Sequence, residues 1–99
     1  MRSLEKIIKD AMGVKKCKFG AREVLHSTKG SKLIVLTKSV SEAMKSRIIE
    51  QAQATEIPIL DYKGNSLQLG KLCNRPFRVS AMALKIGDED EIRNILEGN

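Results

Sequence analysis

The sequence predicts an α/β fold in which helices pack in layers against a short central sheet. Segments with the 3.6-residue period of an amphipathic helix alternate along the chain with short runs of branched apolar residues. The two most apolar runs, 33–36 and 79–84, are separated by helical segments, which favours some parallel pairing in the centre of the sheet. A length of 99 residues and a hydrophobic share of 41% suit one domain over 1–99 with a modest core.

The elements of the first half are predicted from their periods and terminal residues. Apolar residues at the spacing i, i+3, i+4, i+7 and i+8 predict a helix over 3–14. A brief edge strand is expected at 15–19. A second helix is expected over 21–29, closed by Gly30 in the left-handed conformation. The run 33–36 fits a strand buried on both faces.

The second half is predicted to continue the alternation. A helix should begin near Ser41, or slightly earlier at Ser39, whose spacing to Glu42 fits a capping box. A strand at 57–60 contains a proline, which places it at a sheet edge or at a strand end. The remaining elements are a short helix from Asn65 or Ser66 to Leu72, a strand over 79–84 and a helix over 88–96 with acids in its first turn.

The charge of the chain favours a polyanionic partner. The net charge is +6, and residues 1–50 carry 12 Lys and Arg against 5 Asp and Glu, whereas residues 51–99 carry 6 against 7. Such a basic field attracts nucleic acid. No apolar run approaches the ~20 residues that span a bilayer, and charges interrupt each short apolar stretch near the N-terminus. We therefore expect a cytoplasmic protein with no signal peptide and no membrane partner.

Residues that carry enzyme chemistry are sparse. The single histidine, His26, lies in a predicted helix without a serine or cysteine partner at a catalytic spacing. Cys17 and Cys73 are far apart in the sequence and are expected to be buried free thiols. The acids at 88–91 fit a helix N-terminus better than a cation site, and the glycine motifs that bind phosphate do not occur. We expect no enzyme activity, no metal, no cofactor and no small-molecule substrate.

Three loops at predicted element ends hold the candidate binding residues. In the first, Gly20 precedes a helix and Arg22 can meet a phosphate, although a simple strand-to-helix turn is the alternative. The second loop, 37–40, is followed by Lys45. In the third, Phe77 lies between two arginines beside a proline, which suits stacking on an unpaired RNA base better than a core. If the three loops meet at one end of the sheet, they form one RNA-binding face.

Several stretches of the chain, in the same order and spacing, resemble a known protein family. The chain is similar, over roughly residues 3–97, to the L-thirty-e family of archaeal and eukaryotic large-subunit ribosomal proteins, in the kink-turn-binding L-seven-Ae superfamily. The stretches that carry the resemblance are Phe-Gly-Ala-Arg at 19–22, Lys-Leu-Ile-Val-Leu-Thr at 32–37, Ile-Pro-Ile at 57–59, Gly-Asn-Ser-Leu-Gln-Leu-Gly-Lys-Leu-Cys at 64–73 and Arg-Pro-Phe-Arg-Val-Ser-Ala at 75–81.

The resemblance implies a three-layer α-β-α sandwich around a small mixed four-stranded sheet. It implies a structural role in the large ribosomal subunit, with ribosomal RNA and neighbouring ribosomal proteins as partners. The RNA element would be a kink-turn, an internal loop bent sharply between two stems. Ser39 would read a base edge, and Phe77 and Val79 would pack on splayed bases. Together with the basic residues of the loops, the implied RNA-binding set is Gly20, Ala21, Arg22, Lys38, Ser39, Lys45, Phe77, Arg78, Val79 and Ser80.

Two positions depart from the family pattern. Ser39 stands where the family usually has Asn, whose amide can donate and accept at once. Met44 stands where members can carry a basic residue, with Lys45 beside it. Arg22 replaces the Asn of a Gly-x-Asn-Glu pattern, which favours the ribosomal branch over a second hypothesis, the core subunit of an RNA-guided RNA-modification complex. A third hypothesis, from another class, is a protein–protein adaptor with a basic docking face.

Overall fold

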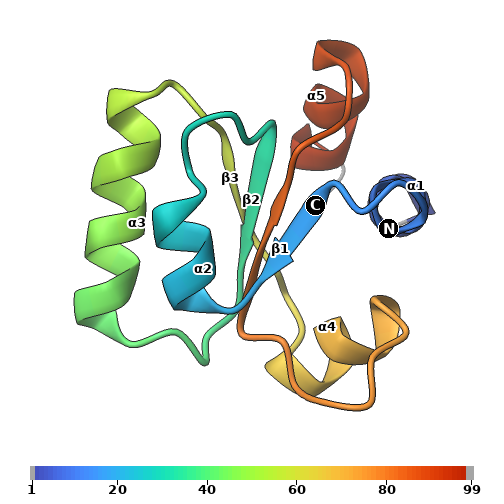
Figure 1. Cartoon of the computed structure of the whole chain (residues 1–99), viewed down its shortest axis with the longest axis horizontal. Coiled ribbons are helices and arrows are strands. Elements are labelled where there is room, and N and C mark those ends of the chain that lie inside the picture. Colours follow the sequence, from blue (N-terminus) through green and yellow to red (C-terminus); the bar gives the residue numbers. More distant parts are fainter. Residues whose placement is uncertain (1, 98–99) are drawn as a thin grey trace.

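Helices cover both faces of a four-stranded sheet (Figure 1), which confirms the predicted α-β-α layers. The computed structural model describes residues 2–97, with side chains from Leu4 onward. Within that range the elements are α1 (Arg2–Gly13), β1 (Cys17–Phe19), α2 (Ala21–His26), β2 (Leu33–Leu36), α3 (Glu42–Ala54), β3 (Ile59–Asp61), α4 (Ser66–Leu72), β4 (Ala81–Leu84) and α5 (Glu89–Glu97).

The sheet is mixed, with the strands in the order β1-β4-β2-β3. The prediction of parallel pairing in its centre is wrong, because the central strands β4 and β2 are antiparallel and the parallel pair is β2 with the edge strand β3. Helix α3, with 13 residues, returns the chain to the end of the sheet where β2 began. Helix α4 has 7 residues and stays near the end where β3 finishes, so β4 enters the sheet from there and runs in the opposite direction (Figure 1).

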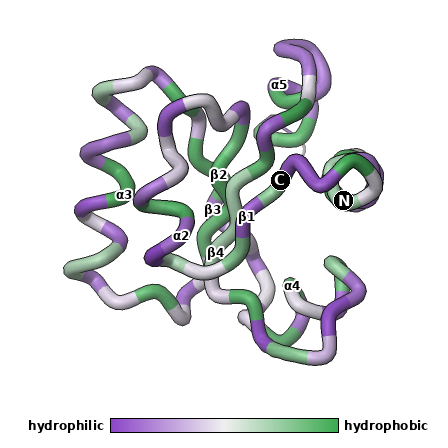
Figure 2. The backbone as a smooth tube through the Cα atoms, viewed as in Figure 1, coloured by the Kyte–Doolittle hydropathy of each residue, from purple (hydrophilic) through white to green (hydrophobic). Residues whose placement is uncertain are grey.

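The sheet separates two hydrophobic clusters, because successive side chains of a strand point to opposite faces. The strands consist mainly of apolar residues, whereas apolar and polar residues alternate along the helices (Figure 2). The alanines on one face of β4, Ala81 and Ala83, lie in the cluster with α2 and α3, and α2 contacts this strand directly. The first cluster joins α1, α4 and α5 to the sheet through Leu33, Val35, Met82 and Leu84. The second joins α2 and α3 to it through Ile34, Leu36, Ala81 and Ala83.

Several boundaries differ from the predictions. Strand β4 begins at Ala81 instead of 79, because the Val79 N–H donates to the Ser66 carbonyl of α4, and β1 begins at Cys17 instead of 15.

Helix α2 ends at His26 instead of 29, and just beyond it the Thr28 hydroxyl donates to the Val24 carbonyl at 2.9 Å. Gly30 has a left-handed φ of 89°, but it lies in the turn beyond this helix and does not close it. Strand β3 begins only after Pro58, since proline has no N–H to give to a sheet.

The structure shows which of the alternative residues cap the N-termini of α3 and α4. Ser41, rather than Ser39, caps α3, because its Oγ accepts from the Met44 N–H at 3.2 Å. Asn65 caps α4 in a reciprocal capping box with Gln68, in which both hydrogen bonds are 2.8 Å long.

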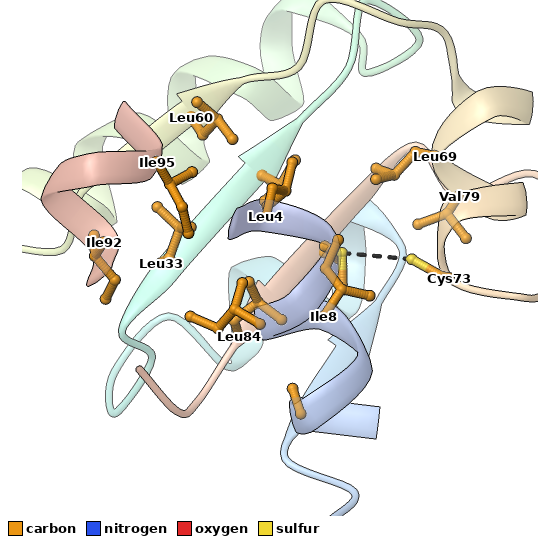
Figure 3. Packing of buried hydrophobic residues seen from close by; sticks show 14 residues of the cluster. Leu4, Ile8, Leu33, Leu60, Leu69, Cys73, Val79, Leu84, Ile92 and Ile95 are labelled. Carbon is orange, nitrogen blue, oxygen red and sulfur yellow. Dashed lines mark hydrogen bonds between the residues drawn. The ribbon is translucent and has the colours of Figure 1, made fainter. Parts of the chain in front are cut away.

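The two cysteines are free thiols, as expected, but they are not equally buried. Cys73 is fully buried, and its Sγ donates to the Met82 sulfur at 3.6 Å (Figure 3). Burial raises the pKa of the Cys73 thiol to about 12, with Cys17 raising it further and Arg75 lowering it. The prediction that Cys17 is buried is wrong: it is only half-buried, because β1 is a short strand at the edge of the sheet.

Candidate nucleic-acid interface

The three candidate loops lie side by side at one end of the sheet (Figure 1). This is the end where β1 and β2 finish and where β4, antiparallel to both, begins. Backbone hydrogen bonds connect the loops: the Gly20 N–H donates to the Ala81 carbonyl at 2.8 Å, and the Thr37 N–H donates to the Ser80 carbonyl at 3.0 Å. The sheet therefore brings together residues that are separated by about sixty positions in the sequence.

A buried hydroxyl holds the second and third loops against each other. Thr37 is only 2% exposed. Its Oγ1 donates to the Ser80 carbonyl at 2.7 Å and accepts from the Ser39 N–H at 3.2 Å. Sequence reasoning missed this residue. The available signal was a hydroxyl placed directly after a fully buried strand, where a buried polar group must find a partner.

The first loop turns sharply into α2 at Gly20. Its φ of 93° is a left-handed value that favours glycine, and its carbonyl accepts from the Val24 N–H at 2.9 Å to begin the helix. Ala21, the first residue of α2, is half-buried and packs against the second hydrophobic cluster. The Arg22 side chain is exposed, and within residues 4–97 no ion pair joins it to an acidic side chain.

The second loop exposes Lys38 and Ser39, which precede a buried Val40. Lys45 is less available than the sequence suggested. It is half-buried on α3, and its Nζ lies 3.6 Å from Asp61 Oδ1, so part of its charge is already offset. Met44 packs against the hydrophobic cluster beneath α3. This packing explains why an apolar residue stands at a position where family members can carry a basic one.

The third loop exposes Phe77 and Arg78. The Phe77 side chain is 53% exposed, which is unusual for one of only three aromatic residues in the chain. The loop packs tightly on α4: a Cβ added to Gly70 would run into the carbonyl oxygen of Phe77 and stand 3.3 Å from its carbonyl carbon. Glycine at this position therefore lets the loop lie close to the helix and sets the position of Phe77. Ser80 is half-buried, with its carbonyl bound by Thr37.

The predicted contact between the Val79 side chain and RNA bases is not compatible with this structure. Val79 is 1% exposed and packs in the cluster with Leu69 and Cys73 (Figure 3). Its N–H donates to the Ser66 carbonyl at 3.0 Å, which ties the loop to α4. The expectation came from the family resemblance, carried over by position, whereas Val79 anchors the loop from beneath.

Arg75 is a further basic residue near this face that sequence reasoning did not select. The centre of its guanidinium lies 4.9 Å from the centroid of the Phe19 ring, a cation–π distance. The ring fixes the arginine beside the first loop, where its N–H groups remain able to donate. In the sequence, the position of Arg75 directly before Pro76 could have indicated this residue.

Two structural features are absent from residues 2–97. These residues contain no group of three or more His, Cys, Asp or Glu side chains arranged to hold a metal ion. No helix in this range is both long and apolar enough to cross a membrane. His26, exposed at the end of α2, takes part in no metal-binding group of these residues.

The fold and the loop face define a small α-β-α protein whose exposed basic and aromatic residues gather at one end of a mixed sheet. The chain belongs to the ribosomal protein L7Ae/L30e/S12e/Gadd45 family, whose sequence profile matches residues 2–93. The large ribosomal subunit protein eL30 of Saccharolobus solfataricus is 28% identical over 97 residues, which cover 96% of this chain and 90% of the relative.

Solved structures support the fold. A protein of unknown function from Bacillus halodurans superposes with a TM-score of 0.73 at 18% identity, over 92% of this chain and 90% of the other. The 15.5kD RNA binding protein of Giardia lamblia superposes with a TM-score of 0.69 at 17% identity, over 97% of this chain and 80% of the other. At these identities the likeness concerns the fold alone.

Proposed function

We propose that the protein is a structural RNA-binding component of the large ribosomal subunit, with ribosomal RNA and neighbouring ribosomal proteins as its partners. The observation that carries the proposal is the gathering of Arg22, Lys38, Arg78 and an exposed Phe77 at one end of the sheet. The relative from Saccharolobus solfataricus is a large-subunit ribosomal protein, which supports the assignment to that subunit. The role is structural and not catalytic.

The RNA element is a kink-turn. A sharp bend brings two phosphate backbones close together and leaves bases unpaired. Cations spread over three loops suit the backbones, and an exposed aromatic ring suits an unpaired base. Phosphate contacts by Arg22, Lys38 and Arg78 position the RNA, while Phe77 stacks and Ser39 offers one hydroxyl to a base edge. The backbone of Gly20 and Ala21 lines the same face. Lys45 contributes less, because Asp61 offsets its charge.

Binding to a kink-turn RNA and to a straight duplex of equal length, compared in gel shifts, tests the proposal. We expect a clear preference for the kink-turn at moderate salt, because a duplex offers phosphates but no unpaired base. Equal affinity for both RNAs would refute kink-turn recognition. Recovery of small guide RNAs in place of ribosomal subunits would move the protein to a modification complex. Partner binding that survives nuclease treatment would favour a protein adaptor.

Phe77→Ala tests the stacking contact. Loss of one base–aromatic stack should weaken kink-turn binding by ~1–3 kcal/mol, or roughly 5- to 150-fold. Val14→Ala is a matched control, since Val14 is also an exposed apolar side chain and lies in the turn after α1, away from the three loops. Unchanged affinity in Phe77→Ala would remove this residue from the interface.

A further inference from the structure

At the end of the sheet opposite the three loops, a lysine directly flanks each of three adjacent strands, β1, β4 and β2. The Lys85 N–H donates to the Lys16 carbonyl at 2.9 Å, and the Lys32 N–H donates to the Leu84 carbonyl at 2.7 Å. The pairing of Leu84 with its neighbours on both sides places Lys16, Lys85 and Lys32 in the next row of the sheet, side by side. We call these three residues the lysine row.

Two further lysines flank this row. Lys15 directly precedes it in the turn after α1, and Lys29 lies in the turn after α2. The Lys85 Nζ reaches to within 3.9 Å of the point where a Cβ would stand on Gly30, beside Lys29. Lys15, Lys16, Lys29 and Lys32 are exposed and Lys85 is half-buried. Five positive charges therefore gather at the end of the sheet where β1 and β2 begin and β4 finishes.

The lysine row places like charges side by side, although the acidic residues Glu56, Asp88 and Glu89 line the same hollow as Lys32. Adjacent strands lie about 4.8 Å apart, and like charges directly opposite each other in a sheet destabilise it. Among the side chains of residues 4–97, no ion pair joins any of the five lysines to an acidic residue. Lysine on the edge strand β1 alone could serve to prevent aggregation. That role does not explain Lys85 and Lys32, because β4 and β2 are the two central strands.

We infer that the lysine row binds the phosphate backbone of a second RNA segment, so that the protein bridges two RNA elements. The inference rests on the proposed function, because it extends RNA binding from the loop face to the opposite end. A closely spaced row of lysines matches phosphates as point charges and offers no bidentate or stacking group to read bases. A double strand presents phosphates at a higher density than a single strand, so the second segment is a duplex, recognised without regard to its sequence.

The dimensions of the molecule allow both ends to be occupied at once. The longest extent of the Cα trace is 29 Å, and the strands connect the two ends directly. Each end faces away from the other, so an RNA at the loops does not cover the lysine row (Figure 1). The acids of the α5 N-terminus, Asp88 to Glu91, lie beyond β4 and limit how far an RNA backbone can extend in that direction.

A ternary binding assay tests the bridge. Protein saturated with labelled kink-turn RNA is titrated with a straight duplex, and a slower gel band reports the second RNA. The test variant is Lys16→Gln/Lys32→Gln/Lys85→Gln. The control, with the same change in net charge, is Lys6→Gln/Lys9→Gln/Arg47→Gln on the outer sides of α1 and α3. Thermal unfolding verifies that both variants fold; relief of repulsion should leave the Tm of the test variant at or above that of the control.

The inference predicts a separation of the two binding events. The test variant should keep kink-turn affinity within about twofold of the control, lose roughly tenfold or more in duplex affinity, and show a log–log salt slope smaller by about 3, one per lost phosphate contact. Equal duplex binding by both variants would overturn it, as would parallel loss of both RNAs.

The assay also distinguishes failure of the bridge from failure of the proposed function. If the unmodified protein shows no kink-turn preference but binds duplex through the lysine row, the kink-turn proposal fails and the lysine row stands as an RNA site. If a polyglutamate chain displaces the duplex at equal concentration of charge, the row is an acidic-protein site and the RNA assignment is overturned.

Discussion

Gly70 connects the stability of the fold to the position of the RNA-binding loop, and Gly70→Ala measures that connection. Alanine inside a helix is favoured over glycine by up to ~1 kcal/mol. At Gly70, however, the new Cβ would meet the carbonyl oxygen of Phe77 and lie 3.3 Å from its carbonyl carbon and 3.5 Å from the Arg78 Cα. These are backbone atoms, so the whole loop must move. Overpacking of this kind costs ~1–3 kcal/mol.

The matched control is Gly13→Ala at the end of α1, where an added Cβ meets nothing within 4 Å. It keeps the gain in helix propensity without the clash, so the two variants should differ by ~1–3 kcal/mol in free energy of unfolding. For a chain of this size that difference corresponds to roughly 4–20 °C in Tm. Circular dichroism melts measure it. Gly70→Ala should also bind kink-turn RNA more weakly, because Phe77 is displaced. A Tm for Gly70→Ala at or above that of Gly13→Ala would refute this account of the loop.

Three further predictions follow from buried groups near the loop face. Thr37→Val removes both hydrogen bonds of a buried hydroxyl and should lower the free energy of unfolding by ~1–2 kcal/mol in urea titrations. The control Thr55→Val, at an exposed position, should lower it less. Equal effects of the two substitutions would contradict the role of Thr37 in holding the second and third loops together. Val79→Ala should lower the free energy of unfolding by ~1–3 kcal/mol through lost burial. Phe77→Ala should leave the free energy of unfolding nearly unchanged and weaken RNA binding. A larger loss of stability in Phe77→Ala than in Val79→Ala would mean that Phe77 is the core residue and Val79 the RNA contact. Because burial raises the pKa of Cys73 from its ordinary value of about 9 to about 12, the folded state keeps this proton after the unfolded state has lost it. The thiol's contribution to stability is therefore full below pH 9 and should fall by at most ~1.4 kcal/mol per pH unit between pH 9 and 12. Cys73→Ala should flatten the pH dependence in that window, and an identical slope would contradict the shift.

The layers and elements could be predicted because each rests on local periodicity. The fully apolar run Leu33–Leu36 identified a doubly buried strand, and the Asn65 cap identified the start of α4. Strand order could not be predicted in this way. It depends on whether the helix between two strands crosses the sheet, and the period of α4 says nothing about its direction in space. The antiparallel pairing of β2 with β4 follows from that direction.

The same distinction between local sequence pattern and tertiary contacts applies to the residues of the binding face. Exposed Phe77 and Arg22 were identifiable, because an aromatic ring among arginines and a basic residue after a loop glycine are conspicuous in the sequence. Val79 was misassigned and Thr37 was missed, because burial in a loop depends on the neighbouring chain rather than on local pattern. Lys45 was overvalued for a similar reason: Asp61, its ionic partner, is 16 residues away in the sequence and belongs to strand β3, whereas Lys45 lies on helix α3.

The central position of β4 determines when the loop face can come into existence. Strand β4 lies between β1 and β2, yet it is the last strand in the chain. As the protein is synthesised, β1 has no partner in the sheet until residues 81–84 have emerged, and the carbonyls of Ala81 and Ser80 are not there to hold Gly20 and Thr37. A nascent chain that ends before β4 therefore exposes its basic loops without arranging them. Shape-specific RNA capture becomes possible only once β4 has joined the sheet, and it coincides with closure of the hydrophobic core.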